Sequence, residues 1–425
     1  MIKIYKGLDR SIDEIMGRTG TEKSNVEDIV SDIIENVKKN GDKALYEYAE
    51  KFDGVKLTSL EVTQEEIDKA FAETDDKFIE ILKEAADNIT AYHKKQVRNN
   101  FVMNEKDGVV IGQKITPVER AGLYVPGGTA SYPSSVLMNV IPAKIAGVPE
   151  ICMTTPPSKD GSVSSVILVA AKIAGVNKIY KTGGAQAIAA LAYGTETIKP
   201  VYKIVGPGNM FVAEAKKQVY GKVSIDMIAG PSEILVIADK TCNPAFVAAD
   251  LLSQAEHDKF ASSVLVTDSE ELANKVSDEL EKQIPMLSRS EIARYSIDNF
   301  GKIFVTDNLH KSIEVANEIA PEHLELCVDN PFDYLSEIKN AGSIFLGKYC
   351  PEALGDYFAG PNHTLPTSGT AKFSSPLSVD DFIKKSSFIY YTQNALEKEY
   401  DKVAYFAEKE GLTAHAKSAT IRFEA

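Results

Sequence analysis

A six-residue segment occurs twice in this chain, and its spacing is the strongest constraint on the fold. Residues 143–148 read Ala-Lys-Ile-Ala-Gly-Val, and the same sequence returns at residues 171–176, a period of 28 residues from position 143 to position 171. In both copies a helical segment ends at a glycine, and a β-rich run follows, first at 151–154 and then at 178–182. This period is about the length of one strand plus one helix, so the repeat predicts consecutive βαβ units in a parallel sheet.

Short apolar runs and helical segments continue to alternate beyond the repeat. They form two series, which predict two incomplete Rossmann-like α/β domains. The first series adds predicted helices at 185–193 and 211–219 and strands at 203–205 and 234–238. The second series consists of predicted helices at 244–257, 270–282 and 311–319 and strands at 263–267, 302–305, 324–328 and 343–346.

The first hundred residues have helical periodicity instead. Ser24 with Glu27, and Thr63 with Glu66, have the spacing of capping boxes that open helices. Gly41 follows the first of these helices where a C-terminal cap is expected. Thr74 is the expected N-cap of a third helix, and His93 falls in a polar helical stretch that predicts a solvated side chain.

These segments give a domain plan for the chain. Residues 1–22 form an N-terminal arm, and residues 23–121 together with 232–379 form a first α/β domain with a helical N-terminal part. Residues 122–231 form a second Rossmann-like domain, and residues 380–425 form a small C-terminal tail domain. The stretch 347–379 is rich in Gly, Pro, Ser and Thr, and a loop of that length inside a compact protein is usually functional.

Composition excludes several classes of partner. The net charge of −14 argues against a nucleic-acid partner, because phosphate binding needs a surplus of Lys and Arg. The most apolar stretch, 166–176, is interrupted by Lys172 and is too short to span a bilayer, so no membrane partner is expected. The start of the chain has no apolar core of a signal peptide, and the four cysteines have no paired spacing. Both features predict a cytoplasmic protein with reduced thiols.

Glycine-rich segments follow three of the predicted strands. The dinucleotide motif G-x-G-x-x-G is absent, but Gly127-Gly128, Gly183-Gly184 and Gly206-Pro207-Gly208-Asn209 occur in successive βα units. Each alone is ordinary turn chemistry. Together they favour a nucleotide crevice at the carboxyl ends of the strands.

The six histidines are few enough to weigh singly. His257 lies three residues after Gln254 at a helix end, so the two side chains share a face within reach of one ion, although a polar helix end is the simpler explanation. His323 follows Glu322 at a helix–strand junction, where the pair has the chemistry of a general acid and base but is equally compatible with a surface turn. His363 lies in the long loop after Asp356.

Nine separated motifs, taken in order, resemble the histidinol dehydrogenase family along nearly the whole chain. They are Tyr124 to Gly128, Gly184 to Ala187, Gly206 to Asn209, Gly230 to Glu233, Gln254 to His257, Pro321 to His323, Gly355 to Tyr357, Asn362 to Pro366 and Leu412 to His415. The resemblance implies oxidation of L-histidinol through L-histidinal to L-histidine, the last step of histidine biosynthesis, with two NAD consumed in succession. It also implies one zinc ion per subunit, held by Gln254, His257, Asp356 and His415.

The resemblance assigns the remaining roles as well. His323 takes the hydroxyl proton as the catalytic base, and Glu322 activates the water that adds to the aldehyde. Further substrate contacts come from Ser232, His363 and Glu410, and NAD contacts come from Tyr124, Gln186 and Asn209 in the domain of residues 122–231. The family is also expected to form an intertwined homodimer, in which the tail after residue 380 completes the active site of the partner subunit.

Three alternatives compete with this interpretation. A nucleophilic cysteine is rejected, because Cys152 and Cys327 fall inside predicted strands and neither Cys242 nor Cys350 adjoins a base. A zinc hydrolase would need no dinucleotide crevice. A periplasmic-type binding protein is expected to carry an export signal, which is not seen at the start of this sequence. It would also have no use for an acid/base pair.

Overall fold

The computed structural model describes residues 2–6, 12, 16, 25–127 and 131–424. They form two compact units. Unit 1 comprises Met1–Gln96 and Val118–Phe382, and unit 2 comprises Val97–Pro117 and Ile383–Ala425. Ser24 and Gly128, and most of the predicted arm 1–22, lie outside the described residues.

The first parallel sheet lies in unit 1 and carries the repeat. Its strands are β4 (Arg120–Tyr124), β5 (Glu150–Thr155), β6 (Lys178–Lys181), β7 (Lys203–Val205) and β8 (Ser224–Ile225), in the order β6-β5-β4-β7-β8. Its helices are α6 (Pro133–Ala146), α7 (Ser165–Ala174), α8 (Gly184–Tyr193) and α9 (Met210–Val219). The helices α6 and α7 both end at left-handed glycines, Gly147 and Gly175. The two predicted βαβ units are therefore confirmed.

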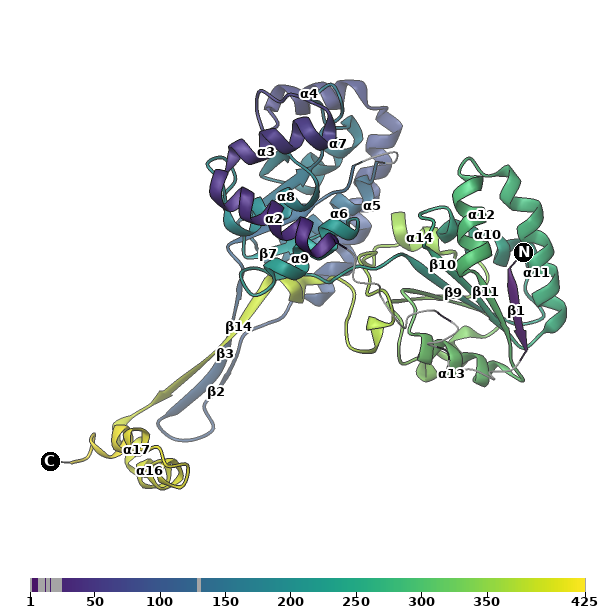
Figure 1. The fold of residues 1–425 in the computed structure, drawn as a ribbon. Coiled ribbons are helices and arrows are strands. Elements are labelled where there is room, and N and C mark those ends of the chain that lie inside the picture. Colours follow the sequence, from purple (N-terminus) through teal and green to yellow (C-terminus); the bar gives the residue numbers. More distant parts are fainter. Residues whose placement is uncertain (1, 7–11, 13–15, 17–24, 128–130, 425) are drawn as a thin grey trace. The chain divides into compact units, whose positions relative to one another are not determined.

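The second parallel sheet of unit 1, some of whose strands are labelled in Figure 1, has the same strand order with one additional strand at its edge. Its order is β1-β11-β10-β9-β12-β13, with strands β1 (Lys3–Lys6), β9 (Glu233–Ala238), β10 (Ser262–Thr267), β11 (Lys302–Val305), β12 (His323–Cys327) and β13 (Ser343–Leu346). Its helices are α10 (Pro244–Ala255), α11 (Glu270–Gln283), α12 (Ser290–Phe300), α13 (Leu309–Ile319) and α14 (Glu352–Tyr357). In both sheets the strand order reverses beside the first strand, at β4/β7 and at β9/β12, which are the topological switch points.

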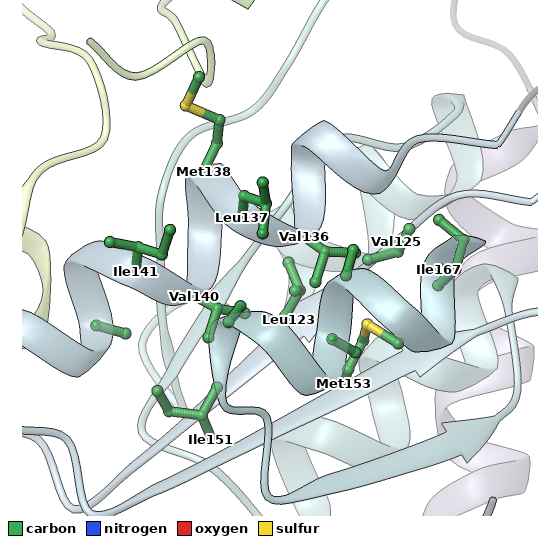
Figure 2. Close-up of a cluster of buried hydrophobic side chains, with 14 of the residues drawn as sticks. Leu123, Val125, Val136, Leu137, Met138, Val140, Ile141, Ile151, Met153 and Ile167 are labelled. Atoms are coloured by element: carbon green, nitrogen blue, oxygen red, sulfur yellow. The ribbon is translucent and has the colours of Figure 1, made fainter. Parts of the chain in front are cut away.

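The N-terminal helices cover the first sheet. They are α2 (Val26–Asn40), α3 (Asp42–Tyr48), α4 (Gln64–Glu73) and α5 (Asp76–His93), and they pack on α6, α7, α8 and α9. Figure 2 shows the core they help to enclose, where Leu123 and Met153 of the sheet meet Val136 and Val140 of α6. The sequence-based plan grouped residues 23–121 with residues 232–379, and this packing differs from it, because an apolar helix face does not specify the sheet on which it packs.

Local predictions in this region had mixed outcomes. The capping box of Thr63 and Glu66 is confirmed, with both of its hydrogen bonds formed. Thr74 is not the N-cap of α5, because Asp75 accepts the hydrogen bond from the Phe78 amide. His93 is completely buried, so the prediction that it is solvated was wrong.

Unit 2 is a three-stranded antiparallel sheet followed by helices. Its strands are β2 (Phe101–Met103), β3 (Val109–Pro117) and β14 (Ile383–Tyr391), and its helices are α15 (Gln393–Glu397), α16 (Tyr400–Lys409) and α17 (Thr413–Thr420). The core between α16 and α17 consists of only Ala404, Ala407 and Ala416. Among the described helices of both units, none is long and apolar enough to cross a membrane.

Candidate active site

The predicted acid/base pair lies at the amino edge of the second sheet. His323 is the first residue of β12, and its neighbours across the sheet are Ile234 of β9 and Ser343 of β13. Glu322 immediately precedes the strand, and both side chains are buried. The surface-turn alternative is therefore wrong.

The backbone carbonyl of Glu233 shows that Nδ1 of His323 carries a hydrogen. Its Nδ1 lies 3.0 Å from the carbonyl oxygen of Glu233. A carbonyl can only accept, so we assign a ring hydrogen to Nδ1, and Nε2 is the ring nitrogen that can gain or lose a proton. Nε2 is buried and has no hydrogen-bond partner among the described residues. The imidazole is thus oriented with its proton-exchanging nitrogen available to a ligand.

Carboxyl groups surround this imidazole. Burial alone would lower the pKa of His323, but Glu352, Glu322 and Asp356 outweigh burial and raise it well above the ordinary value. Burial also raises the pKa of Glu322 to about 8, and its Oε2 accepts a hydrogen bond of 2.8 Å from the Glu233 amide. A carboxyl group with a pKa near neutrality can both take up and release a proton at physiological pH.

Two of the four residues expected to hold a metal, Asp356 and Gln254, lie beside His323. Asp356, on α14, places Oδ1 3.7 Å from His323 Nε2 and 3.8 Å from His363 Nδ1. Burial pushes the pKa of Asp356 up, but the neighbouring imidazoles of His323, His363 and His257 lower it overall. Gln254, at the end of α10, is buried within 3.0 Å of His323 Nδ1. This buried set of imidazole, carboxylate and amide donors fits a zinc ion.

Glu352 belongs to the same cluster and was missed in the sequence. It accepts hydrogen bonds from Ser253 Oγ (2.7 Å) and Gln254 Nε2 (3.2 Å), and its carboxylate lies 3.8 Å from His323 Nε2. Glu352 and Asp356 are four residues apart, which places them on one face of a helix. That spacing was a usable signal, but residues 347–379 were expected to lack regular structure.

A second pair of acidic residues, Glu325 and Asp250, lies at the start of helix α14. Glu325 of β12 is completely buried, and its Oε1 accepts a hydrogen bond of 2.7 Å from the Glu352 amide at the start of the helix. Glu325 also hydrogen-bonds Asp250, and burial with this neighbouring charge raises the pKa of Glu325 well above its ordinary value. Two carboxyl groups this close retain a proton between them.

The residues expected to contact NAD lie at the carboxyl edge of the first sheet. Tyr124, the last residue of β4, accepts a hydrogen bond of 3.2 Å at its hydroxyl from the Gly184 amide at the start of α8. Gln186 is buried two residues further along α8. Asn209 caps α9 by accepting from the Phe211 and Val212 amides. Tyr124 and Asn209 lie at the ends of β4 and β7, the two strands at the switch point, and the nucleotide crevice at the carboxyl ends of these strands stays a prediction.

The other predicted residues are spread over both units. Ser232 is half-buried just before β9. In unit 2, Glu410 is the exposed C-cap residue that follows α16, and His415 is exposed on α17. Burial raises the pKa of Cys152 to about 12 and of Cys242 to about 11, and it raises the pKa of Cys327 as well. These thiols remain protonated at neutral pH, which supports the rejection of a cysteine nucleophile.

Comparison with known proteins identifies the family. The family model described as histidinol dehydrogenase matches residues 16–423. The histidinol dehydrogenase of Clostridium acetobutylicum is 61% identical over 407 residues, covering 96% of this chain and 94% of that protein, and that of Bacillus subtilis is 55% identical over 415 residues, covering 98% and 96%. The crystal structure of histidinol dehydrogenase from Elizabethkingia anophelis superposes with a TM-score of 0.94 at 40% identity, covering 99% of this chain and 98% of that one.

These matches leave no place for the hydrolase or the binding-protein alternative. The chain belongs to the histidinol dehydrogenase family, the NAD-dependent oxidoreductases that catalyse the last step of histidine biosynthesis.

Proposed function

We propose that this protein oxidises L-histidinol to L-histidine in two steps at one carbon, through bound L-histidinal, with two NAD consumed and in the cytoplasm. The observation that carries the proposal is the buried His323 imidazole, whose Nε2 has no partner among the described residues, next to Glu322. An alcohol oxidation requires such a base at the reacting hydroxyl.

In the first oxidation His323 Nε2 takes the hydroxyl proton while the carbon gives its hydride to NAD. The Nδ1 hydrogen bond to the Glu233 carbonyl supports this role, because it stabilises the imidazolium that forms. The products are the aldehyde, NADH and a proton on His323. General-base assistance of this kind contributes on the order of a hundredfold or more.

In the second oxidation water must add to the aldehyde before another hydride can leave. Glu322 takes the proton from this water, and its burial and its pKa of about 8 suit proton uptake near neutral pH. The protonated His323 returns its proton to the aldehyde oxygen as the hydrate forms, and the neutral imidazole then takes a hydroxyl proton from the hydrate as the second NAD accepts the hydride. The two bases are adjacent in the chain, so the intermediate need not leave between steps.

Gln254, His257 and Asp356 are proposed zinc ligands from unit 1, and His415 is the proposed fourth. When bound, zinc would clasp the amino and imidazole nitrogens of the substrate, and its charge would offset the carboxylates around His323. Ser232, His363 and Glu410 are proposed to hold the substrate. Tyr124, Gln186 and Asn209 are proposed to hold NAD at the carboxyl edge of the first sheet.

The protein is proposed to act as an intertwined homodimer. Val403 and Phe406 on α16 are 48% and 68% exposed, an unusual solvation for apolar side chains on a helix with so small a core. A partner subunit would cover this surface. Glu410 and His415 would then enter the partner's active site.

The test is turnover of the purified protein with L-histidinol and NAD before and after a strong chelator. We expect two NADH per histidine and no free aldehyde, loss of turnover on chelation, and recovery with zinc. NAD binding should survive chelation, because none of the three proposed NAD contacts is a metal ligand. Full activity of a preparation that elemental analysis shows to be metal-free would contradict the zinc assignment, and efficient trapping of the aldehyde would contradict a bound intermediate.

A further inference from the structure

Two oppositely charged side chains are buried beneath the turn that connects β7 to α9. Lys216 lies on α9 and Asp226 directly follows β8, and their side chains are 2% and 1% exposed. Lys216 Nζ forms an ion pair with Asp226 Oδ1. Neither residue belongs to the acid/base or metal cluster at the second sheet.

The pair holds both polar groups of a single backbone residue, Gly206. Lys216 Nζ donates to the Gly206 carbonyl oxygen at 3.0 Å, and the Gly206 amide donates to Asp226 Oδ2 at 2.8 Å. Asp226 Oδ1 also accepts from the Met227 amide at 2.6 Å. The ion pair therefore fixes the orientation of both peptide groups that flank Gly206.

Gly206 occupies a position where the backbone has little freedom. Its φ is 115°, a region that residues with a Cβ rarely adopt, and a Cβ there would overlap the carbonyl oxygen of Tyr124. The turn is thus pressed against the end of β4. Asn209 follows Gly206 by three residues, is exposed and is the N-cap of α9.

Stability alone does not explain a buried pair at this place. Removing two charges from water costs as much as their attraction returns in many proteins, and an apolar pair of similar volume is often at least as stable. What an ion pair adds is direction, because charged groups hydrogen-bond their neighbours in fixed geometry. Here two of the directed bonds, one from Lys216 and one to Asp226, converge on Gly206.

We propose that Lys216 and Asp226 are positioning residues for NAD, which set the Gly206–Asn209 turn in the conformation that binds the dinucleotide. This inference rests on the proposed function, in which Asn209 contacts NAD. Both side chains are buried and bond Gly206, so their effect on NAD would pass through the Gly206 peptide groups.

The experiment compares NAD dissociation constants, measured by calorimetry on the full-length protein. The variants are Lys216→Met, the double variant Lys216→Met/Asp226→Leu, and Lys216→Arg as the conservative replacement. Lys217→Met is the matched control, because Lys217 is the next residue of α9 and forms only an exposed ion pair with Glu214. Asn209→Ala reports whether the turn contacts NAD at all.

We expect the Kd for NAD to rise about tenfold or more in Lys216→Met and in the double variant, the usual effect of losing directed bonds to a buried group. Lys216→Arg should recover part of the affinity, and Lys217→Met should bind NAD normally. Binding of L-histidinol, whose proposed site is on the other sheet, should not change. The double variant is decisive, because it removes the positioning bonds without leaving a buried charge.

A double variant that melts like the wild type and binds NAD normally would overturn the proposal. If neither the single nor the double variant folds, the pair serves stability and the proposal is equally wrong. If Asn209→Ala itself leaves NAD affinity unchanged, the crevice assignment in the proposed function fails instead. Weak binding in Asn209→Ala with normal binding in the double variant would refute only the positioning role.

Discussion

The chemistry of single residues here depends on neighbours that are distant in the chain. The Glu233 carbonyl orients His323 from 90 positions away, and Asp356 and Glu352 approach it from helix α14. The sequence showed that Glu322 and His323 are adjacent and chemically suited to a proton transfer. It could not show that both are buried, because their burial depends on how three strand starts align.

The first prediction separates the two bases. His323→Ala should slow both half-reactions, because this base takes the hydroxyl proton in each, whereas Glu322→Gln should mainly slow the oxidation of supplied L-histidinal. Loss of a general base costs on the order of 100- to 10,000-fold in rate. Single-turnover rates of NADH formation from L-histidinol and from L-histidinal measure both effects.

Gln has nearly the same shape as Glu, so Glu322→Gln removes the ability to accept a proton while preserving the packing. The Gln carbonyl oxygen can still accept the hydrogen bond that Glu322 Oε2 receives from the Glu233 amide. L-Histidinal oxidation at the wild-type rate in Glu322→Gln would show that this carboxylate does not activate the water.

The second prediction concerns Asp53 and pH. Burial raises the pKa of Asp53 to about 6, and its Oδ2 has no hydrogen-bond partner among the described residues. The folded protein therefore binds this proton more tightly than the unfolded chain. The contribution to stability is fully present below the unfolded pKa of about 4 and is lost as the pH rises through about 6.

Asp53→Asn removes the charge that is unfavourable in the folded state. Its melting temperature should exceed that of the wild type at about pH 8 and match it at about pH 4. Thermal unfolding without NAD at both pH values measures this difference. An equal difference at the two pH values would mean that the carboxyl group does not titrate as described.

At the scale of elements, the helix α14 brings the active-site groups together. It carries Glu352 and Asp356, and Glu325 accepts the hydrogen bond from its first amide. Because a carboxylate only accepts, the contact with Glu352 orients the Gln254 amide nitrogen toward Glu352, and the amide oxygen would be the atom that binds the proposed zinc.

The third prediction follows from this contact. Glu352→Gln can donate as well as accept, so the Gln254 amide loses its fixed orientation and zinc should bind about 10- to 100-fold more weakly. Competition with a chromogenic chelator measures the affinity independently of turnover. Glu314→Gln is the control, since Glu314 is exposed on α13 and pairs only with Lys311. Unchanged zinc affinity in Glu352→Gln would contradict the orienting role.

Helices and strands with a clear local sequence pattern could be predicted, and short elements without such a pattern could not. The repeat placed α6, α7 and their glycine caps correctly, because a helix that ends at a left-handed glycine is a local property of the sequence. The strand β1 was missed because a four-residue edge strand is defined by its pairing with β11. The helix α14, with six residues among glycines and prolines, is too short to show a period.

At the scale of the whole molecule, the sequence did not predict which helices and strands pack together. The helices α2 to α5 have clear apolar faces, yet nothing local assigns them to the first sheet. The hairpin of β2 and β3 joins β14 of the tail across more than 260 residues of chain, from Pro117 to Ile383. Long-range pairing of this kind is decided by the assembled surface and not by periodicity.

The last prediction tests whether active sites are shared between subunits. His415 and Glu410 belong to unit 2, and Glu322 belongs to unit 1. If each tail completes the partner's site, a dimer of one Glu322→Gln chain and one His415→Ala chain contains one site with both defects and one site with neither. Each variant should be nearly inactive alone, and the mixed dimer, isolated with two affinity tags, should regain activity at one of its two sites. If each chain supplied its own tail, every site would retain one defect and the mixed dimer would stay inactive, a result that would refute the shared site while leaving the roles of Glu322 and His415 intact.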